Sequence, residues 1–212
     1  MKKFINRQDA GRALAESLQS FKNNPNTIVL ALPRGGVPVA YEIAEALSLP
    51  LDIFIVRKLG VPQHEELAMG AIASGETVVF NKDVIHSCQI SQTEIDNVIK
   101  QEKEELLRRE KTYRGNHLFP DLANQTIILV DDGIATGATM RVAIKALRQY
   151  QPKRIVVAVP VAEVTIYKEI QSLVEEIICP LTPSHLSAVG AWYDDFAQTT
   201  DEEVFNLLRI II

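Results

Sequence analysis

Two adjacent carboxylates and a run of small and hydroxyl-bearing residues lie together near the middle of the chain. Asp131 and Asp132 follow the apolar run 127–130. Carboxylates accept hydrogen bonds and repel phosphate, so the pair suits hydroxyl groups, a divalent cation or developing positive charge. A helix that begins just after them could present backbone N–H groups to an anion. A sugar phosphate would satisfy both parts of this segment, and the predicted phosphate-binding residues are Ala135, Thr136, Gly137, Ala138 and Thr139.

A second corner, earlier in the chain, also has the composition of an anion site. The apolar run 27–32 leads through Pro33 into Arg34, Gly35 and Gly36. Two glycines let backbone N–H groups point inward, and the arginine adds positive charge. Glycine turns after strands are common, so this segment indicates an anion site mainly because it accompanies the central one.

The central segment resembles the phosphoribosyl-pyrophosphate signature of the type I phosphoribosyltransferases: an apolar strand, two acids, then Thr-Gly-x-Thr. The resemblance implies that Asp131 and Asp132 hold the ribose and stabilise a cationic transition state. It places the 5′-phosphate at residues 135–139 and the pyrophosphate at Arg34, Gly35 and Gly36, and it implies Mg²⁺ as cofactor. The alternative is an ordinary strand-loop-helix corner in which Asp and Thr only cap the helix.

Further candidates for catalysis follow the next apolar run. Arg57 and Lys58 come after the expected strand 51–56, and cations at that end of a parallel strand point toward the ligand crevice. Segment 59–76, rich in Gly and Pro, lies where the family has a mobile catalytic loop. His64 in this segment could stabilise leaving pyrophosphate or move a proton. The alternative for these residues is a solvated strand end and a plain connection.

An aromatic cluster marks the carboxyl-terminal part of the chain. Trp192 and Tyr193 lie in a polar segment with Gly190, and aromatic rings over a crevice stack on flat heterocycles. The segment is similar to the base-recognition region of purine phosphoribosyltransferases, which implies that Asp194 takes part in metal binding. The alternative is that the aromatic side chains pack this segment, a hood, against the core.

Three departures from the enzymes for 6-oxopurines bear on the acceptor. Ala135 stands where those enzymes have an acid, Val161 and Ala162 stand where they have a lysine, and Ser187 replaces their stacking aromatic residue. Hypoxanthine and guanine are therefore expected to be poor acceptors. The chain also shares Val-Arg-Lys-Leu-Gly and Gly-Ala-Trp-Tyr with uncharacterised bacterial proteins that are described as predicted phosphoribosyltransferases.

The order of elements predicts one α/β domain over residues 1–212. Apolar runs without a period of two indicate parallel strands buried on both faces, so we expect a doubly wound, mainly parallel five-stranded sheet of the phosphoribosyltransferase type. A lid and an inserted helix are expected at about 59–115, and the hood at about 180–212. Segment 81–91 is expected to be irregular, and Ser91 with Glu94 forms a capping box for a long helix.

The composition of the 212 residues excludes several classes of protein. A net charge of −5 without any Lys/Arg cluster argues against a nucleic-acid partner. The apolar character of the amino terminus ends too early for a signal peptide, and no apolar run approaches membrane-spanning length. Two cysteines far apart indicate a reducing cytoplasm. The sequence leaves a homodimer open.

These observations predict an enzyme of nucleotide metabolism. It would transfer a phosphoribosyl group from phosphoribosyl pyrophosphate to a planar nitrogenous acceptor, with Mg²⁺. The rival hypothesis is a non-catalytic sensor that binds phosphoribosyl pyrophosphate or a nucleotide. Binding needs only the phosphate loop, whereas catalysis also needs the pyrophosphate loop and the lid groups, and their presence favours the enzyme.

Overall fold

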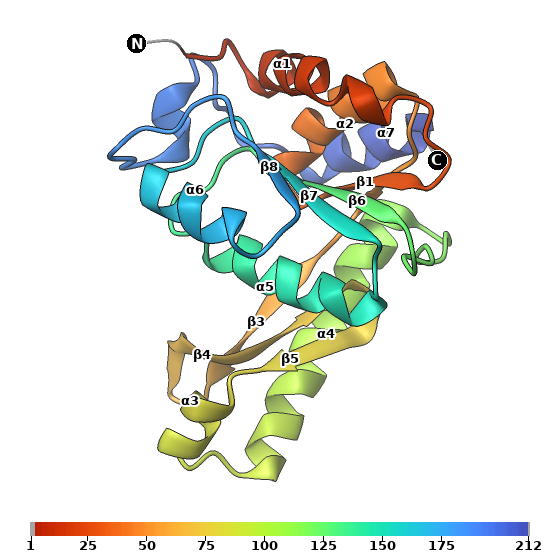
Figure 1. The fold of residues 1–212 in the computed structure, drawn as a ribbon. Helices are drawn as coiled ribbons and strands as arrows, with labels where there is room; N and C mark the ends of the chain where they lie inside the picture. The colour runs from red at the N-terminus through yellow and green to blue at the C-terminus, as the bar shows by residue number, and fades with distance from the viewer. Residues whose placement is uncertain (1–2, 212) are drawn as a thin grey trace.

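A five-stranded, all-parallel sheet forms the centre of the computed structural model, which describes residues 3–211 and the side chains of residues 3–209 (Figure 1). The strand order is β2-β1-β6-β7-β8. Neighbouring strands are in register, with Thr27 opposite Thr126 and Thr126 opposite Arg154. The strands are β1 (Thr27–Ala31), β2 (Leu51–Ile53), β6 (Thr126–Val130), β7 (Arg154–Ala158) and β8 (Glu176–Ile178).

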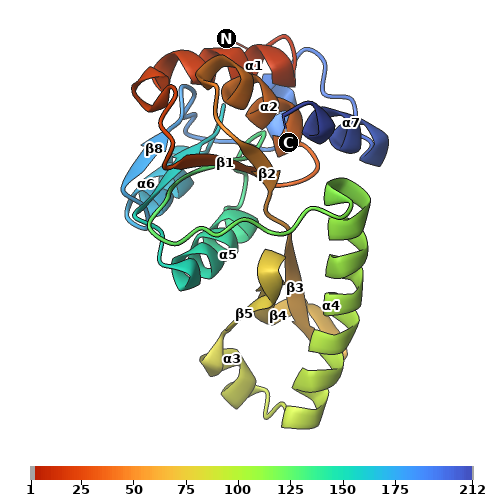
Figure 2. The same cartoon turned by 90° about the vertical axis from the view of Figure 1, so that its right-hand side faces the viewer.

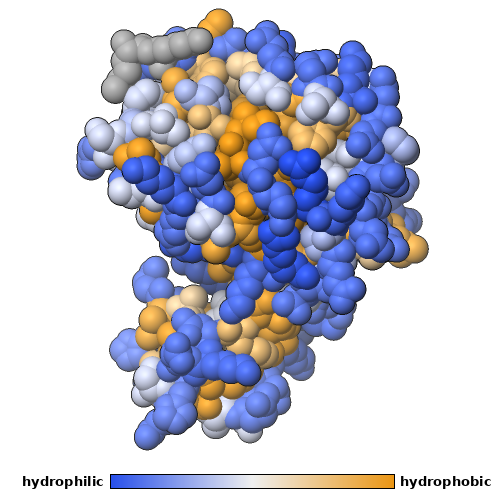
Figure 3. All heavy atoms as spheres, in the orientation of Figure 1, coloured by the Kyte–Doolittle hydropathy of each residue, from blue (hydrophilic) through white to orange (hydrophobic). Residues whose placement is uncertain are grey.

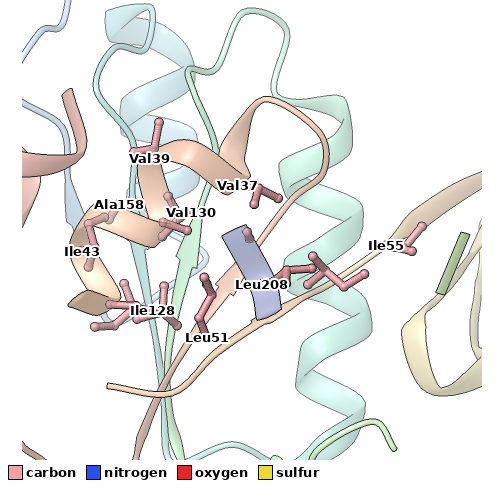
Figure 4. Close-up of a cluster of buried hydrophobic side chains, with 14 of the residues drawn as sticks. Val37, Val39, Ile43, Leu51, Ile55, Ile128, Val130, Ala158 and Leu208 are labelled. Carbon is pink, nitrogen blue, oxygen red and sulfur yellow. The ribbon is translucent and has the colours of Figure 1, made fainter. Parts of the chain in front are cut away.

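Helices cover both faces of this sheet because alternate strand residues enter two separate hydrophobic clusters. Val29 and Ala31 belong to one cluster, whereas Ile28 and Leu30 belong to the other. Figure 4 shows the first cluster, to which Leu208 of the carboxyl-terminal helix and the sheet residue Val130 both belong. The first face carries α1 (Arg7–Ser17), α2 (Gly36–Leu47) and α7 (Asp201–Ile211), and the second carries α5 (Ala138–Leu147) and α6 (Val164–Gln171). The predicted doubly wound fold is confirmed.

A second, antiparallel sheet projects from the body of the molecule between β2 and β6 (Figures 1 and 2). We call residues 56–114 the hairpin unit. It contains β3 (Val56–Val61), β4 (His64–Ala73), β5 (Thr77–Phe80), α3 (Lys82–Ser87) and α4 (Gln92–Arg114).

The hairpin unit differs from the sequence prediction in three places. The expected strand 51–56 is divided, since β2 ends at Ile53 and β3 begins at Val56. The expected lid segment 59–76 is mostly a paired hairpin: Gly60 and Gly70 lie inside strands, and the turn between the strands is Pro62 and Gln63. The expected irregular segment 81–91 contains the short helix α3.

The long helix α4 has the capping box that the sequence predicts. The Ser91 hydroxyl accepts from the Glu94 N–H at 3.3 Å, and the Glu94 carboxylate accepts from the Ser91 N–H at 2.9 Å. At its other end, buried Arg114 donates to both carboxylate oxygens of Asp52, at 3.0 and 3.1 Å. This ion pair fastens the end of α4 to strand β2.

The hood is built from both ends of the described chain. The Phe4 N–H donates to the Trp192 carbonyl at 3.0 Å, and the Asp194 N–H donates back to the Phe4 carbonyl at 2.9 Å. The sequence assigns residues 180–212 to the hood, yet α7 packs on the body through Val204 and Leu208. Met1, Lys2 and residue 212, which belong to the predicted single domain, lie outside the described residues. No helix among residues 3–211 is long and apolar enough to span a membrane.

Candidate functional site

The two predicted ligand loops lie against each other at the carboxyl end of the parallel sheet. Arg34, Gly35 and Gly36 follow β1, and the paired carboxylates follow the neighbouring strand β6. A Cβ atom at Gly35 would overlap the Asp132 carboxylate, and one at Gly36 would lie 2.7 Å from the Val130 carbonyl oxygen. Only glycine, which has no side chain, allows the two loops to approach this closely. Two segments that are about a hundred residues apart in the sequence therefore form one site.

Asp132 is bound by an arginine that the sequence analysis did not identify. The Arg7 guanidinium places both Nε and Nη2 at 2.8 Å from Asp132 Oδ2, and its Nη1 donates to the Ala197 carbonyl at 2.7 Å. The guanidinium carbon lies 3.8 Å from the centre of the Phe196 ring, within the range of a cation–π contact. Arg7 is therefore held between the hood and the acidic pair.

Asp131 has a different environment from its neighbour. Its Oδ1 accepts the Asp132 N–H at 2.9 Å, and within residues 3–209 no side-chain cation lies within 4.0 Å of it. Burial, and secondly the charge of Asp132, raises the pKa of Asp131 well above its ordinary value. Burial also raises the pKa of Asp132, but Arg7 opposes this effect. One carboxylate is neutralised by the protein, and the other remains available to a ligand.

The predicted phosphate loop lies at the start of α5. Thr136, Ala138 and Thr139 are exposed around a cavity of about 200 Å³ that Asp131 also lines. Gly137 has φ +74°, a left-handed conformation that side chains rarely adopt. A Cβ there would also lie 2.8 Å from Ile166, so a valine at this position would strain the loop itself.

A second cavity of about 490 Å³ continues from the acidic pair toward the hood. Val189 lines both cavities, which places them side by side. Arg34 lies at this second cavity, with Nη1 3.5 Å from Asp201 Oδ1 at the start of α7. The side chains that line it include two cations, one carboxylate and one aromatic ring: Arg7, Arg34, Asp132 and Phe196. The two cavities together combine the predicted phosphate loop, a polar middle and an aromatic wall.

The two aromatic residues predicted to stack on the acceptor are buried. Trp192 is 8% exposed and Tyr193 is 4% exposed, and both pack in a cluster with Phe4 and Leu186. The Tyr193 hydroxyl donates to the Asp132 carbonyl at 2.6 Å. The geometry corrects the stacking prediction and matches the alternative, in which these rings pack the hood against the core. Phe196 is the aromatic residue that faces the cavity.

The predicted catalytic residues of the lid lie in the hairpin unit and line neither cavity. Arg57 is engaged by Glu102, with Nε at 2.7 Å and Nη2 at 2.6 Å from its carboxylate, which fastens β3 to α4. Lys58 and His64 are exposed, and His64 is the first residue of β4 at the tip of the hairpin. Their catalytic roles stay predictions.

Asp194, the predicted metal ligand, is exposed on the hood. In the described part of the chain no three His, Cys, Asp or Glu side chains gather as a metal cluster. Mg²⁺ commonly takes only one or two carboxylates from a protein and completes its shell with water and substrate phosphates. The carboxylate of Asp131, which has no side-chain cation within 4.0 Å in the described part of the chain, is compatible with that mode of binding.

The sequence prediction omitted two residues of this site, Arg7 and Phe196, although Phe196 lies in the aromatic segment that it singled out. A signal for Arg7 was present, since it falls on the same helical face as the buried Ala10 and Leu14. A charged side chain on a buried face needs a partner. The sequence could not identify that partner, because Asp132 is 125 positions away.

The fold is that of a phosphoribosyl transferase domain. The sequence profile of the phosphoribosyl transferase domain matches residues 5–191, so the chain belongs to that family. Two Mycobacterium tuberculosis proteins, from strains CDC 1551 and H37Rv, carry provisional names as phosphoribosyl transferases and are each 42% identical to this chain over 209 residues. That match covers 98% of this chain but 47% of each relative, so the chain spans about half the length of these curated relatives.

Solved structures show the same architecture. The protein TT1426 from Thermus thermophilus is similar to the chain with a TM-score of 0.86 and 36% identity, covering 100% of this chain and 99% of that protein. AQ2163 from Aquifex aeolicus has a TM-score of 0.51 at 12% identity, over 87% of this chain and 78% of the other. The second likeness is one of fold alone.

Proposed function

We propose that this protein transfers a phosphoribosyl group from phosphoribosyl pyrophosphate to a planar nitrogenous acceptor and releases pyrophosphate. The observation that carries the proposal is the pair of adjoining cavities, with the Thr136–Thr139 loop in one, Arg34 in the other and the acidic pair between them. Phosphate, ribose and pyrophosphate occur in that order along the donor. One extended molecule can therefore contact all three groups of residues.

The acidic pair suits the charge that develops during this reaction. The bond between the anomeric carbon and pyrophosphate oxygen breaks, a bond to the acceptor nitrogen forms, and a proton leaves that nitrogen. The ring oxygen shares positive charge as pyrophosphate departs. Asp131, which forms no ion pair with any cation of residues 3–209, stabilises such a charge better than a carboxylate that is already neutralised. Asp132, held by Arg7, would contact the ribose hydroxyls.

Mg²⁺ fits this site through Asp131, and Asp194 remains a second candidate ligand from the hood. When bound, the ion would neutralise charge on the leaving pyrophosphate. Arg34 would add a side-chain cation to the same phosphates, for which it must exchange its long contact with Asp201. Lys58 and His64 would reach the donor only if the hairpin unit closes over the cavities.

The acceptor would lie against Phe196, whose ring lines the 490 Å³ cavity. A ring on one side and hydrogen-bonding groups at the edge suit a flat heterocycle. No acid stands at position 135 to exchange a proton with a 6-oxopurine, and no lysine follows β7 to read its oxygen. Hypoxanthine and guanine are expected to be poor acceptors. The two free cysteines suit a reducing cytoplasm.

Thr139→Val tests the phosphate loop, with Thr93→Val as a matched control. Both threonines are exposed second residues of a helix, α5 and α4 respectively. Loss of one hydrogen bond to a charged phosphate should weaken ribose 5-phosphate binding about tenfold. Calorimetric titration should show this loss for Thr139→Val and none for Thr93→Val. Equal affinities in the two variants would refute the assignment.

The acceptor requires a kinetic test. Pyrophosphate release is measured with phosphoribosyl pyrophosphate saturating and a panel of nucleobases. We expect turnover of at least one base, reduced by Phe196→Ala, with guanine and hypoxanthine poor. Donor binding without turnover of any base would favour the sensor, and efficient use of guanine unaffected by Phe196→Ala would contradict the acceptor assignment.

A further inference from the structure

A cavity of about 670 Å³ lies outside this site, between α5 and the hairpin unit. Figure 3 shows the molecule hollowed between the body and the hairpin unit, with hydrophobic atoms beside the hollow. Cavities of this size hold small organic ligands. We call it the α5 groove, and its lining is Ala68, Gly70, Val79, Phe80, Asn81, Lys82, Asp83, Arg141, Val142 and Lys145.

The α5 groove has a cationic rim and an apolar floor. Lys82 and Lys145 supply two positive charges, and Arg141, which is paired with Glu169, supplies a third, against the single negative charge of Asp83 within the lining. This excess stands out in a chain whose net charge is −5. The Lys145 ammonium donates to the Phe80 carbonyl at 2.9 Å, so one cation is held at the groove by the hairpin unit.

The floor offers contact surface for a flat, apolar group. Val79 is buried, while Phe80 and Val142 are half-buried and border the cavity. Gly70, which has no side chain, lies beside Phe80 in the sheet, opposite it in register. A ring could therefore contact the sheet face while an anionic group reaches the rim.

Arg141 connects the α5 groove to the phosphate loop. Its Nη2 donates to the Thr136 carbonyl at 3.0 Å, and its Nη1 lies 3.1 Å from the Glu169 carboxylate. The same guanidinium packs against Gly137, since a Cβ there would lie 2.8 Å from Nη1. An anion in the groove would attract this guanidinium, and a shift of the guanidinium toward the groove would lengthen its hydrogen bond to the Thr136 carbonyl.

We propose that the α5 groove is a second ligand site, which binds an amphipathic anion with a planar ring and a phosphate or carboxylate group. Occupancy draws Arg141 away from Thr136 and so weakens phosphate binding in the 135–139 loop. By linkage, phosphate in the loop weakens binding in the groove by the same factor. The binding half stands on the groove alone, whereas the regulatory half rests on the proposed function.

The probe for binding is adenosine 5′-monophosphate, which has both a flat ring and an anionic group. It could also enter the phosphate loop, so binding is measured in Thr139→Glu, which places a negative charge in that loop. Glutamate is well tolerated in the first turn of an exposed helix. Calorimetry should then report one site, which belongs to the α5 groove.

Charge reversal identifies that site. Lys82→Glu with Lys145→Glu, added to Thr139→Glu, should lower the affinity for the probe at least tenfold. Lys22→Glu with Lys153→Glu makes the same charge change at exposed lysines outside the groove and should leave it within about twofold, since separated surface charges are screened. Absence of binding in Thr139→Glu, or equal affinity in the two charge-reversed proteins, would overturn the site.

The coupling is tested separately by amide resonances. Adding the probe to Thr139→Glu should shift the backbone signals of Thr136 and Gly137, and the groove variant should lose these shifts. Probe binding that leaves both signals unmoved would overturn the link through Arg141. Failure of phosphoribosyl transfer in the wild-type protein would count against the proposed function and would leave the groove measurement standing.

Discussion

Arg7 makes two neighbouring carboxylates chemically unequal. It donates to Asp132 from two nitrogens, and it leaves Asp131 with no side-chain cation within 4.0 Å in the described chain. Two adjacent buried acids repel each other, and neutralising one of them lowers the cost of keeping both. We therefore assign different roles to the two carboxylates: Asp132 would position the ribose, and Asp131 would stabilise positive charge.

Asp131→Asn is expected to make the protein more stable at neutral pH and less active. The native pKa of Asp131 lies above the value of about 4 expected for the unfolded chain. The native state therefore binds more protons and loses stability as the pH rises from about 4 through the raised pKa. Asparagine keeps the acceptor for the Asp132 N–H and removes the charge.

Thermal unfolding at pH 7.5 and at pH 4 measures this effect. The variant should melt about 2–4 °C above the parent at pH 7.5, the shift that ~1 kcal/mol gives a domain of this size, and near the parent at pH 4. Turnover should fall at least ~10-fold, or 1.4 kcal/mol. A melting temperature of Asp131→Asn below that of the parent at pH 7.5 would contradict the inference that the buried charge of Asp131 destabilises the native state.

Arg7→Ala is expected to destabilise the fold much more than Arg12→Ala on the same helix. Arg7 and Asp132 are both mostly buried, and removing one partner of a buried pair costs about 3 kcal/mol. Arg12 is 58% exposed in its side chain and pairs with Glu42 at 3.3 Å, so its loss should cost less than about 1 kcal/mol. Urea unfolding compares them, and equal costs would exclude a structural role for the Arg7 pair.

At the scale of elements, the tip of the hairpin unit is poorly fixed compared with the parallel sheet. Residues 63–67 are exposed, and the pairing of β3 with β4 shifts register on either side of Gly60. Few buried contacts and exposed backbone hydrogen bonds are features of segments that open locally. The tip is therefore suited to move while the β1–β6 edge stays in place.

Hydrogen exchange tests this movement. Amides of residues 61–68 should exchange faster than those of β1 and β6 by several orders of magnitude, because β1 and β6 are buried on both faces. Phosphoribosyl pyrophosphate should slow exchange at the tip more than tenfold if the hairpin unit closes over it. If exchange at the tip is unchanged when the ligand is bound, the hairpin unit does not close over the donor.

The sequence predicted the elements whose signal is local and missed those that depend on distant partners. β1 and β6 are continuous apolar runs between helices, and the capping box of α4 is complete within four residues. The strands β3 and β4 were not predicted because Gly60, Pro62 and Gly70 are residue types that are typical of loops. For the site, the phosphate loop and the acidic pair are contiguous in sequence, whereas Arg7 acquires its role only from the folded chain.

At the scale of the whole molecule, a buried ion pair between Arg114 and Asp52 joins the hairpin unit to the body. Arg114 is 5% exposed and Asp52 is 7% exposed, and Arg114 Nη2 also donates to the Ile53 carbonyl at 3.1 Å. Burial raises the pKa of Asp52, and Arg114 opposes that rise. The contact lies where the chain leaves β2 and where α4 returns.

Arg114→Leu should cost about 3–5 kcal/mol of unfolding free energy, because it leaves a buried carboxylate without its cation. The matched change Arg108→Leu, on an exposed side of α4, should cost less than about 1 kcal/mol. Limited proteolysis should cut residues 54–56 faster in Arg114→Leu, since the unit loses its attachment. Equal cleavage in both variants would show that packing alone holds the unit in place.

The pairing of the hood has a consequence for synthesis on the ribosome. Arg7 donates to the Ala197 carbonyl across 190 positions, and Phe4 pairs with residues 192–194. Residues 4–7 can make these contacts only after residues 192–197 have been synthesised, whereas the paired strands β1 and β6 can assemble much earlier. A nascent chain halted after β8 would carry both ligand loops and still lack the groups that hold Arg7 over Asp132. Synthesis itself therefore delays completion of the site until all five strands of the parallel sheet have been made.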